Sequence, residues 1–216
     1  MAKRKGIFKR LLDTVKWPLR RAYWWVARRV RPPSLPTDGS GKVMIHLGCG
    51  KIQAAGYVNV DLVARPHVHY VHPVAPLEMF ADASADLIYA SHVLEHLGLA
   101  EAPAALKEWR RVLKAGGVLR LAVPDFASLV QLYQDGKDLE LIIEPLLGGQ
   151  DDDLNVHKSA FDEPRLRRLL LAAGFRQVRA WDPQTADAHD FKDGSNKVRH
   201  VEGRTYPISL NLEAVK

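Results

Sequence analysis

The sequence predicts an α/β domain built around a mostly parallel sheet. Short apolar segments, bounded by glycine, proline and polar residues, alternate with segments in which apolar residues recur every three or four positions. This alternation is typical of parallel sheets. The clearest part of the pattern is an apolar run at 43–45, a Gly48-Cys49-Gly50 turn, and a second short strand that stops on Asp61. Such a strand, glycine turn, strand and acid is typical of nucleotide-binding sites at the edge of a parallel sheet.

The expected strands follow one another along the whole domain. They cover residues 42–47, 57–62, 69–71, 86–91, 118–123, 175–181 and 206–215. Helices are expected at 103–113, with Gly116-Gly117 as its C-cap, at 126–134, and between an Asp162 cap and a Gly174 stop.

Three connections are less regular. Only nine residues separate the first two strands, so we expect a helix of one or two turns at 52–55. Residues 136–160 are expected to be irregular, and residues 183–205 to form a long polar loop.

The N-terminal segment differs in charge from the rest of the chain. Residues 1–31 carry eleven lysines and arginines and one acid, a net charge of +10, which leaves −4 for the remainder. We expect amphipathic helices at 7–16 and 18–30, separated because Pro18 breaks the helix. Their apolar stripe and three tryptophans favour an anionic membrane surface over packing on the domain or a second copy, and over nucleic acid. The predicted divisions are the helical extension 1–34, a linker 35–41 and a domain 42–216.

Other compositional features limit the protein class. The sequence has no uninterrupted apolar run of eighteen or more residues, so no transmembrane helix is expected. A signal peptide is not expected either, because charged residues interrupt the apolar stretch that it would need. Cys49 is the single cysteine, so no disulfide framework is expected and the reducing cytosol is the predicted compartment.

Five short motifs occur in a fixed order: HLGCG at 46–50, NVD at 59–61, SHVLEH at 91–96, LKAGG at 113–117 and AGF at 173–175. Together they resemble the class I S-adenosylmethionine-dependent methyltransferases, over most of the domain. The C-terminal segment 207–216 also resembles a bacterial subgroup associated with cell-surface polysaccharide synthesis. The resemblance implies a Rossmann-like sheet of about seven strands, an antiparallel last strand, helices on both faces, and S-adenosylmethionine as cofactor.

The resemblance also assigns cofactor contacts. It places Gly48, Cys49 and Gly50 along the methionine part, with His46 standing where the family usually has an acid. Asp61 would hold the ribose hydroxyls, Pro76 or Leu77 would lie near the adenine, and Ser91 and His92 would face the donated methyl. A dinucleotide fingerprint would need glycine where this chain has Gln53.

Methyl transfer to a hydroxyl is helped by a general base, and histidine titrates in the required range. The candidate catalytic residues are His92, His157 and Glu95. On a helix starting after Ser91, His92, Glu95 and His96 would share one face. These residues could instead only open a helix beside the cofactor. They also match a metal-binding pattern, but the prediction assigns no metal.

The predicted function is S-adenosylmethionine-dependent O-methylation of a sugar hydroxyl in a cell-surface or lipid-linked glycan, by an enzyme held at the inner face of the membrane. Two alternatives stay open. One is a methyltransferase for RNA or another nucleic acid that uses the basic segment 1–31 to bind it. The other is a non-catalytic assembly subunit, in which the N-terminal helices could mediate oligomerisation.

Overall fold

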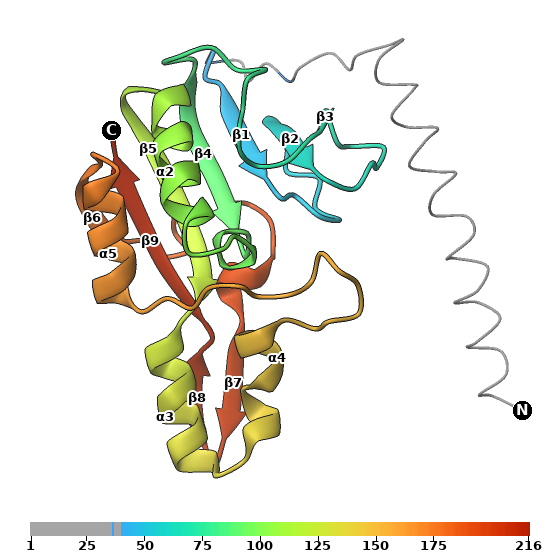
Figure 1. Ribbon diagram of the computed structural model, residues 1–216, viewed down its shortest axis with the longest axis vertical. Coiled ribbons are helices and arrows are strands. Elements are labelled where there is room, and N and C mark those ends of the chain that lie inside the picture. The colour runs from blue at the N-terminus through green and yellow to red at the C-terminus, as the bar shows by residue number, and fades with distance from the viewer. Residues whose placement is uncertain (1–35, 37–39) are drawn as a thin grey trace, which may run out of the picture.

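The structure, a computed structural model, describes residue 36 and residues 40–216 (Figure 1). The helices expected at 7–16 and 18–30, and most of the expected linker, lie outside these residues. No helix in the described part of the chain is both long and apolar enough to cross a membrane.

The centre of the fold is a seven-stranded sheet with the order β3-β2-β1-β4-β5-β9-β6. Its strands are β1 (Met44–Leu47), β2 (Tyr57–Asp61), β3 (Tyr70–Val71), β4 (Ala85–Ser91), β5 (Leu113–Pro124), β6 (Arg176–Ala180) and β9 (Ser209–Val215). β1 to β5 pair in parallel, whereas β9 runs antiparallel to both β5 and β6. The expected sheet of about seven strands with an antiparallel last strand is confirmed.

One face of the sheet packs against α2 (Glu101–Val112) and α5 (Glu163–Ala172) (Figure 1). The backbone amide of Arg165 donates to Oδ1 of Asp162 at 2.8 Å, so the predicted N-cap is confirmed. Gly174, at φ +94°, follows the end of α5 as expected.

The glycine pair at 116–117 does not cap α2, contrary to the expectation. The helix ends at Val112 and β5 begins at the next residue. Gly116, at φ +76°, lies inside the strand, where the pairing with β4 shifts register. The glycines therefore allow an irregularity in β5, because a left-handed conformation costs glycine little.

The opposite face is covered in part by the segment that follows β6. Trp181 and Phe191 pack there against Tyr57 and Tyr89. The hydroxyl of Tyr57 donates to the carbonyl of Ala188 at 2.7 Å, which ties this segment to the sheet.

No helix joins β1 to β2, so the helix expected at 52–55 is wrong. The nine residues turn instead, with the amide of Ile52 donating to the carbonyl of Cys49 at 2.9 Å. Ile52 and Ala54 then pack on the face of the sheet that carries Tyr57 and Tyr89. A connection this short cannot accommodate both a helix and the turns at its two ends.

Two insertions form a small lobe beyond the carboxyl ends of the parallel strands (Figure 1). The first contributes α3 (Phe126–Gly136), η2 (Leu139–Leu141) and α4 (Ile143–Leu147). The second contributes the hairpin of β7 (Val198–Val201) and β8 (Arg204–Pro207). Buried apolar side chains from both insertions pack together: Leu129, Leu132, Ile142, Tyr206 and Ile208. The expectations of an irregular 136–160 and a structureless 183–205 are therefore wrong in part.

Candidate active site

The glycine turn after β1 provides an open backbone surface. Gly48 and Gly50 have φ values of +61° and +56°, conformations that favour glycine. A Cβ added to Gly48 would come within 2.4 Å of the Val93 side chain, whereas one added to Gly50 would meet nothing within 4 Å. Gly48 is thus required by packing, and Gly50 borders free space that a ligand could fill.

Cys49 lies between these glycines and is buried. Burial raises the pKa of its thiol to about 12, and the nearby Asp61 carboxylate adds to the effect. The side chain is therefore a neutral thiol at neutral pH, which agrees with a small packing residue and not with a nucleophile.

Asp61 ends β2 directly beside the turn. Its Oδ2 accepts from the amide of Gly50 at 2.7 Å, and its Oδ1 accepts from the amide of Val63 at 2.7 Å. Arg65 adds an ion pair at 3.3 Å. A carboxylate offers about four acceptor positions, so these contacts orient Asp61 and leave it capacity for a ligand hydroxyl.

The other predicted cofactor residues lie in different surroundings. The His46 ring is buried and stacks on Phe191 at a centroid distance of 5.6 Å, away from the glycine backbone surface. Leu77 is completely buried in the main core, and its amide donates to Glu108. Pro76 is exposed in the same loop. Ser91 and His92 stand at the carboxyl end of β4.

The helix expected directly after Ser91 is wrong. His92 has a φ of +53°, and only a single 3-10 turn, η1 (Leu94–His96), precedes α2. Nε2 of His92 lies 2.8 Å from Oγ of Ser209, and its Nδ1 lies 3.0 Å from Oε1 of Glu95. Both ring nitrogens of His92 therefore already have neighbours within the protein.

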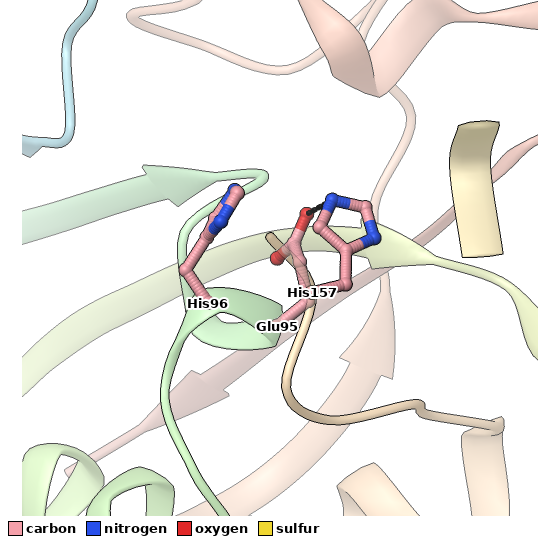
Figure 2. Close-up of side chains that lie close together, drawn as sticks. All are labelled: Glu95, His96 and His157. Carbon is pink, nitrogen blue, oxygen red and sulfur yellow. Dashed lines mark ion pairs between the residues drawn. The ribbon is translucent and has the colours of Figure 1, made fainter. Parts of the chain in front are cut away.

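His157 approaches the same carboxylate from the first insertion. Its Nε2 lies 4.0 Å from Oε1 of Glu95 (Figure 2), and its Nδ1 lies 3.1 Å from the carbonyl of Pro145. The amides of Lys158 and Ser159 both donate to the carbonyl of Glu95, which fixes the segment over η1. The structure thus brings His92, Glu95 and His157, the three predicted catalytic residues, into one cluster.

His96 completes this cluster. Its ring packs edge-on against His157 with centroids 4.9 Å apart, and its Nδ1 lies 3.2 Å from the carbonyl of Val156. Burial lowers the pKa of His157, although the nearby Glu95 carboxylate opposes this shift. His157 is therefore neutral at neutral pH.

A cavity of about 540 Å³ opens beside the histidine cluster. Its walls come from η1, the first insertion and the β7 hairpin. The lining residues include His92, His96, His157, Asn155, Glu144, Lys197, Arg199 and Ile208. His92 directly follows β4, and the next residue, Val93, packs on Gly48. A residue that lines the cavity is therefore next in the chain to one that packs on the glycine turn.

Sequence reasoning missed the lining residues from the second insertion. Lys197, Arg199 and Ile208 reach the cavity from the hairpin region, more than a hundred positions after His92. No local pattern marks such a long-range approach. Arg199 also forms an ion pair with Glu144 at 3.5 Å, which joins the two insertions. This contact could not be predicted from the sequence either.

The comparisons with known proteins agree with this geometry. Residues 52–121 match a family model described as a methyltransferase domain. This match covers about a third of the chain. A methyltransferase structure from Archaeoglobus fulgidus matches at 17% identity with a TM-score of 0.51, covering 97% of this chain and 100% of that one. One from Methanosarcina mazei matches at 16% with a TM-score of 0.50, covering 87% and 95%. A comparison with curated proteins found no match.

S-adenosylmethionine is the cofactor predicted from the sequence, and the residues present fit it. The free space beside Gly50 and the oriented Asp61 carboxylate are what a nucleoside with an attached amino acid requires. The family match covers β2 to β4 and most of β5, and the structural matches show that the fold is that of methyltransferase structures.

Proposed function

We propose that the protein methylates a sugar hydroxyl in a cell-surface or lipid-linked glycan. The observation that carries this proposal is the polar cavity at the carboxyl end of β4, where His92 follows the strand. Its size, about 540 Å³, is in the range of small-molecule sites. Ligands of open α/β sheets bind at this edge, so the cavity is where an acceptor would meet the methyl donor.

The lining of the cavity supports a hydroxylated acceptor. Imidazole, amide, carboxylate, ammonium and guanidinium groups surround it, and all of them can form hydrogen bonds with sugar hydroxyls. Its described lining contains no Trp, Tyr or Phe. Recognition of an unpaired nucleobase usually uses such a ring for stacking, so the lining argues against the nucleic-acid alternative.

Within the cluster, His157 is the better candidate base. Both ring nitrogens of His92 face protein groups, Ser209 and Glu95, whereas no hydrogen bond from the described residues engages Nε2 of His157. Burial keeps His157 unprotonated, so Nε2 can accept the proton of an acceptor hydroxyl. When bound, S-adenosylmethionine supplies an electrophilic methyl group. Glu95 would stabilise the protonated ring.

Two features support an anionic, membrane-bound acceptor. Lys197 and Arg199 line the cavity and could contact a phosphate of a lipid-linked sugar. The segment 1–31, with a net charge of +10, would bring the protein to an anionic membrane surface. The protein would then act at the inner face of the membrane, where its acceptor is assembled.

The proposal is tested by methyl transfer from radiolabelled S-adenosylmethionine to fractionated lipid-linked glycans, with RNA as a parallel acceptor. Label in a glycan fraction, lost in His157→Ala and kept in His72→Ala, is the expected result. His72 is a suitable control because it pairs with Glu78 outside the cavity. Label in RNA alone would replace the proposal with the nucleic-acid alternative.

Cofactor binding and membrane binding are measured separately. Calorimetric titration with S-adenosylhomocysteine should show binding by the full-length protein. Retained binding without turnover on any acceptor would instead favour an assembly subunit. Flotation with anionic liposomes should carry full-length protein and leave a variant lacking residues 1–34 behind.

A further inference from the structure

We propose that Glu95, His96 and His157 bind one divalent transition-metal ion. This goes beyond methyl transfer, since it concerns ion binding by the protein alone. Nε2 of His157 would then bind the ion, and the role of His157 as a base applies to the metal-free protein. The sequence pattern suggested His92, Glu95 and His96 as ligands, but the structure points to a different set, with His157 in place of His92.

The geometry of the three side chains supports this assignment. One ligand atom from each of Glu95, His96 and His157 lies within 4.8 Å of the other two. Glu95 and His96 come from η1, and His157 comes from the first insertion (Figure 2). Two imidazoles and one carboxylate on one side of an ion leave positions open for other ligands, as in the facial triads of metalloenzymes.

The hydrogen bonds of the two imidazoles fix which nitrogen is available. Nδ1 of His96 lies 3.2 Å from the carbonyl of Val156, and Nδ1 of His157 lies 3.1 Å from the carbonyl of Pro145. A carbonyl can only accept, so each Nδ1 carries a proton. In a neutral ring the lone pair is then on Nε2. Metal-binding histidines usually have this arrangement, in which a backbone carbonyl holds the other ring nitrogen.

His92 is held differently. The hydroxyl of Ser209 donates to the carbonyl of Gly194 at 2.7 Å, so it accepts from Nε2 of His92, 2.8 Å away. Nδ1 of His92 then faces Oε1 of Glu95 at 3.0 Å. Both ring nitrogens of His92 thus face protein groups, and we do not assign His92 as a ligand.

Glu95 provides an independent second observation. Its side chain is 1% exposed. Among the described residues, Oε1 has the ion-pair contact with Nδ1 of His92 at 3.0 Å, and neither oxygen has a hydrogen bond of adequate geometry. A buried carboxylate with so few hydrogen bonds is costly, and it is stabilised when it binds a metal. Oε1 also faces Nε2 of His157 at 4.0 Å, an atom that carries a lone pair in the neutral ring. A cation between these atoms would satisfy both.

The ligand set also selects among metals. Nitrogen ligands disfavour Mg²⁺ and Ca²⁺, which prefer oxygen, and suit Zn²⁺, Fe²⁺, Co²⁺ and Ni²⁺. One carboxylate leaves a bound divalent ion with a net positive charge. Because His96 and His157 line the cavity of about 540 Å³, such an ion would be exposed to an acceptor oxygen and would polarise it.

The test measures metal content and affinity without cofactor or acceptor. Full-length protein is loaded with Zn²⁺ or, separately, Mg²⁺, desalted, and analysed by mass spectrometry of the metal, with calorimetry for affinity. The expected result is one Zn²⁺ per chain and no retained Mg²⁺. Glu95→Gln, His96→Ala and His157→Ala should each weaken Zn²⁺ binding on the order of 100-fold or more, because loss of an outer-shell partner alone costs about 10–100-fold.

His72→Ala is the matched control, since His72 also lies 3.0 Å from a glutamate, Glu78, but outside the cavity. It should bind Zn²⁺ as the unaltered protein does. Circular dichroism checks the fold of each variant, and the near-isosteric Glu95→Gln replaces any histidine variant that does not fold. Absence of Zn²⁺ from the unaltered protein would overturn the proposal, as would equal retention by all folded variants. S-adenosylhomocysteine titration of the same samples reports separately on the methyltransferase site.

Discussion

Nε2 of His157 faces Oε1 of Glu95 at 4.0 Å, although the two residues lie far apart in the sequence. Two backbone hydrogen bonds to the carbonyl of Glu95, from Lys158 and Ser159, hold the two segments together. The position of His157 therefore depends on the backbone of the insertion as well as on its own side chain. This contact makes His157, among the predicted bases, the one best placed to act in the cavity.

Replacing His157 with alanine should remove most of the methyl-transfer activity. If Nε2 accepts the acceptor proton, kcat should fall by about 10²- to 10⁴-fold, the usual contribution of a general base. The affinity for S-adenosylhomocysteine should stay within about twofold, because His157 lies in the acceptor cavity and not at the glycine turn. Unchanged kcat in the folded variant would remove His157 from the mechanism.

Replacing Asp61 with asparagine should weaken cofactor binding. The substitution removes the charge that would bind the ribose hydroxyls and replaces one acceptor oxygen, next to Gly50 and Val63, with a donor. We expect the Kd for S-adenosylhomocysteine to rise about 10- to 100-fold, from a loss of about 1.5–3 kcal/mol. Asp125→Asn is the control, since that side chain caps α3 by accepting from Ala127. A Kd unchanged in Asp61→Asn would exclude this residue from the cofactor site.

Comparing Gly50→Ala with Gly203→Ala distinguishes loss of space for a ligand from strain in the backbone. Gly50 and Gly203 both have positive φ values, +56° and +77°, and an added Cβ meets nothing within 4 Å at either position. Both alanine variants should therefore lose a similar stability, about 1 kcal/mol, measured by urea unfolding. Only Gly50→Ala should also weaken S-adenosylhomocysteine binding, by about tenfold or more, because its methyl group would occupy the space beside the turn. Equal affinities in the two variants would show that the cofactor does not approach Gly50.

The parts of the fold that could be predicted from the sequence are those that local chemistry decides. Buried runs such as β1 and β4 are apolar because both faces of a central parallel strand are covered. Asp162 caps α5 through a contact only three residues away. The hairpin of β7 and β8 was missed because most of its side chains are exposed, so its sequence lacks the alternating apolar pattern of a half-buried strand.

The candidate site also has one part that could be predicted from the sequence and one part that could not. The glycine turn and Asp61 lie within a short stretch, so spacing alone indicated them. The cluster was only partly foreseeable. His92, Glu95 and His96 were visible as a motif, but their predicted arrangement on a helix was wrong, because His92 adopts a positive φ before η1. The approach of His157 depends on tertiary packing of the insertion, which no local pattern encodes.

Acid should destabilise the protein through His46 and His189, two buried histidines that pack with Tyr89 and Phe191 on one face of the sheet. Burial lowers the pKa of His46 to about 4, with the Asp193 carboxylate opposing and His189 and His67 contributing in the same direction as burial. Burial also lowers the pKa of His189. For His46 the folded-state pKa lies below the unfolded value of 6.5, so below pH 6.5 the unfolded state takes up the proton first. Its contribution to stability is therefore complete above pH 6.5 and is lost as the pH falls towards 4, by about 3 kcal/mol.

His46→Phe should reduce this acid sensitivity. Among the described residues Nδ1 of His46 has no hydrogen-bond partner, and the ring stacks on Phe191, so a phenyl ring would keep the stacking and remove this unpaired nitrogen. Urea unfolding at pH 7 and pH 5 should show a smaller loss of stability in this variant than in the unaltered protein. A residual loss is expected because His189 remains. His200→Phe, at an exposed position, should keep the full pH dependence. An equal loss in His46→Phe and His200→Phe would show that His46 does not carry the effect.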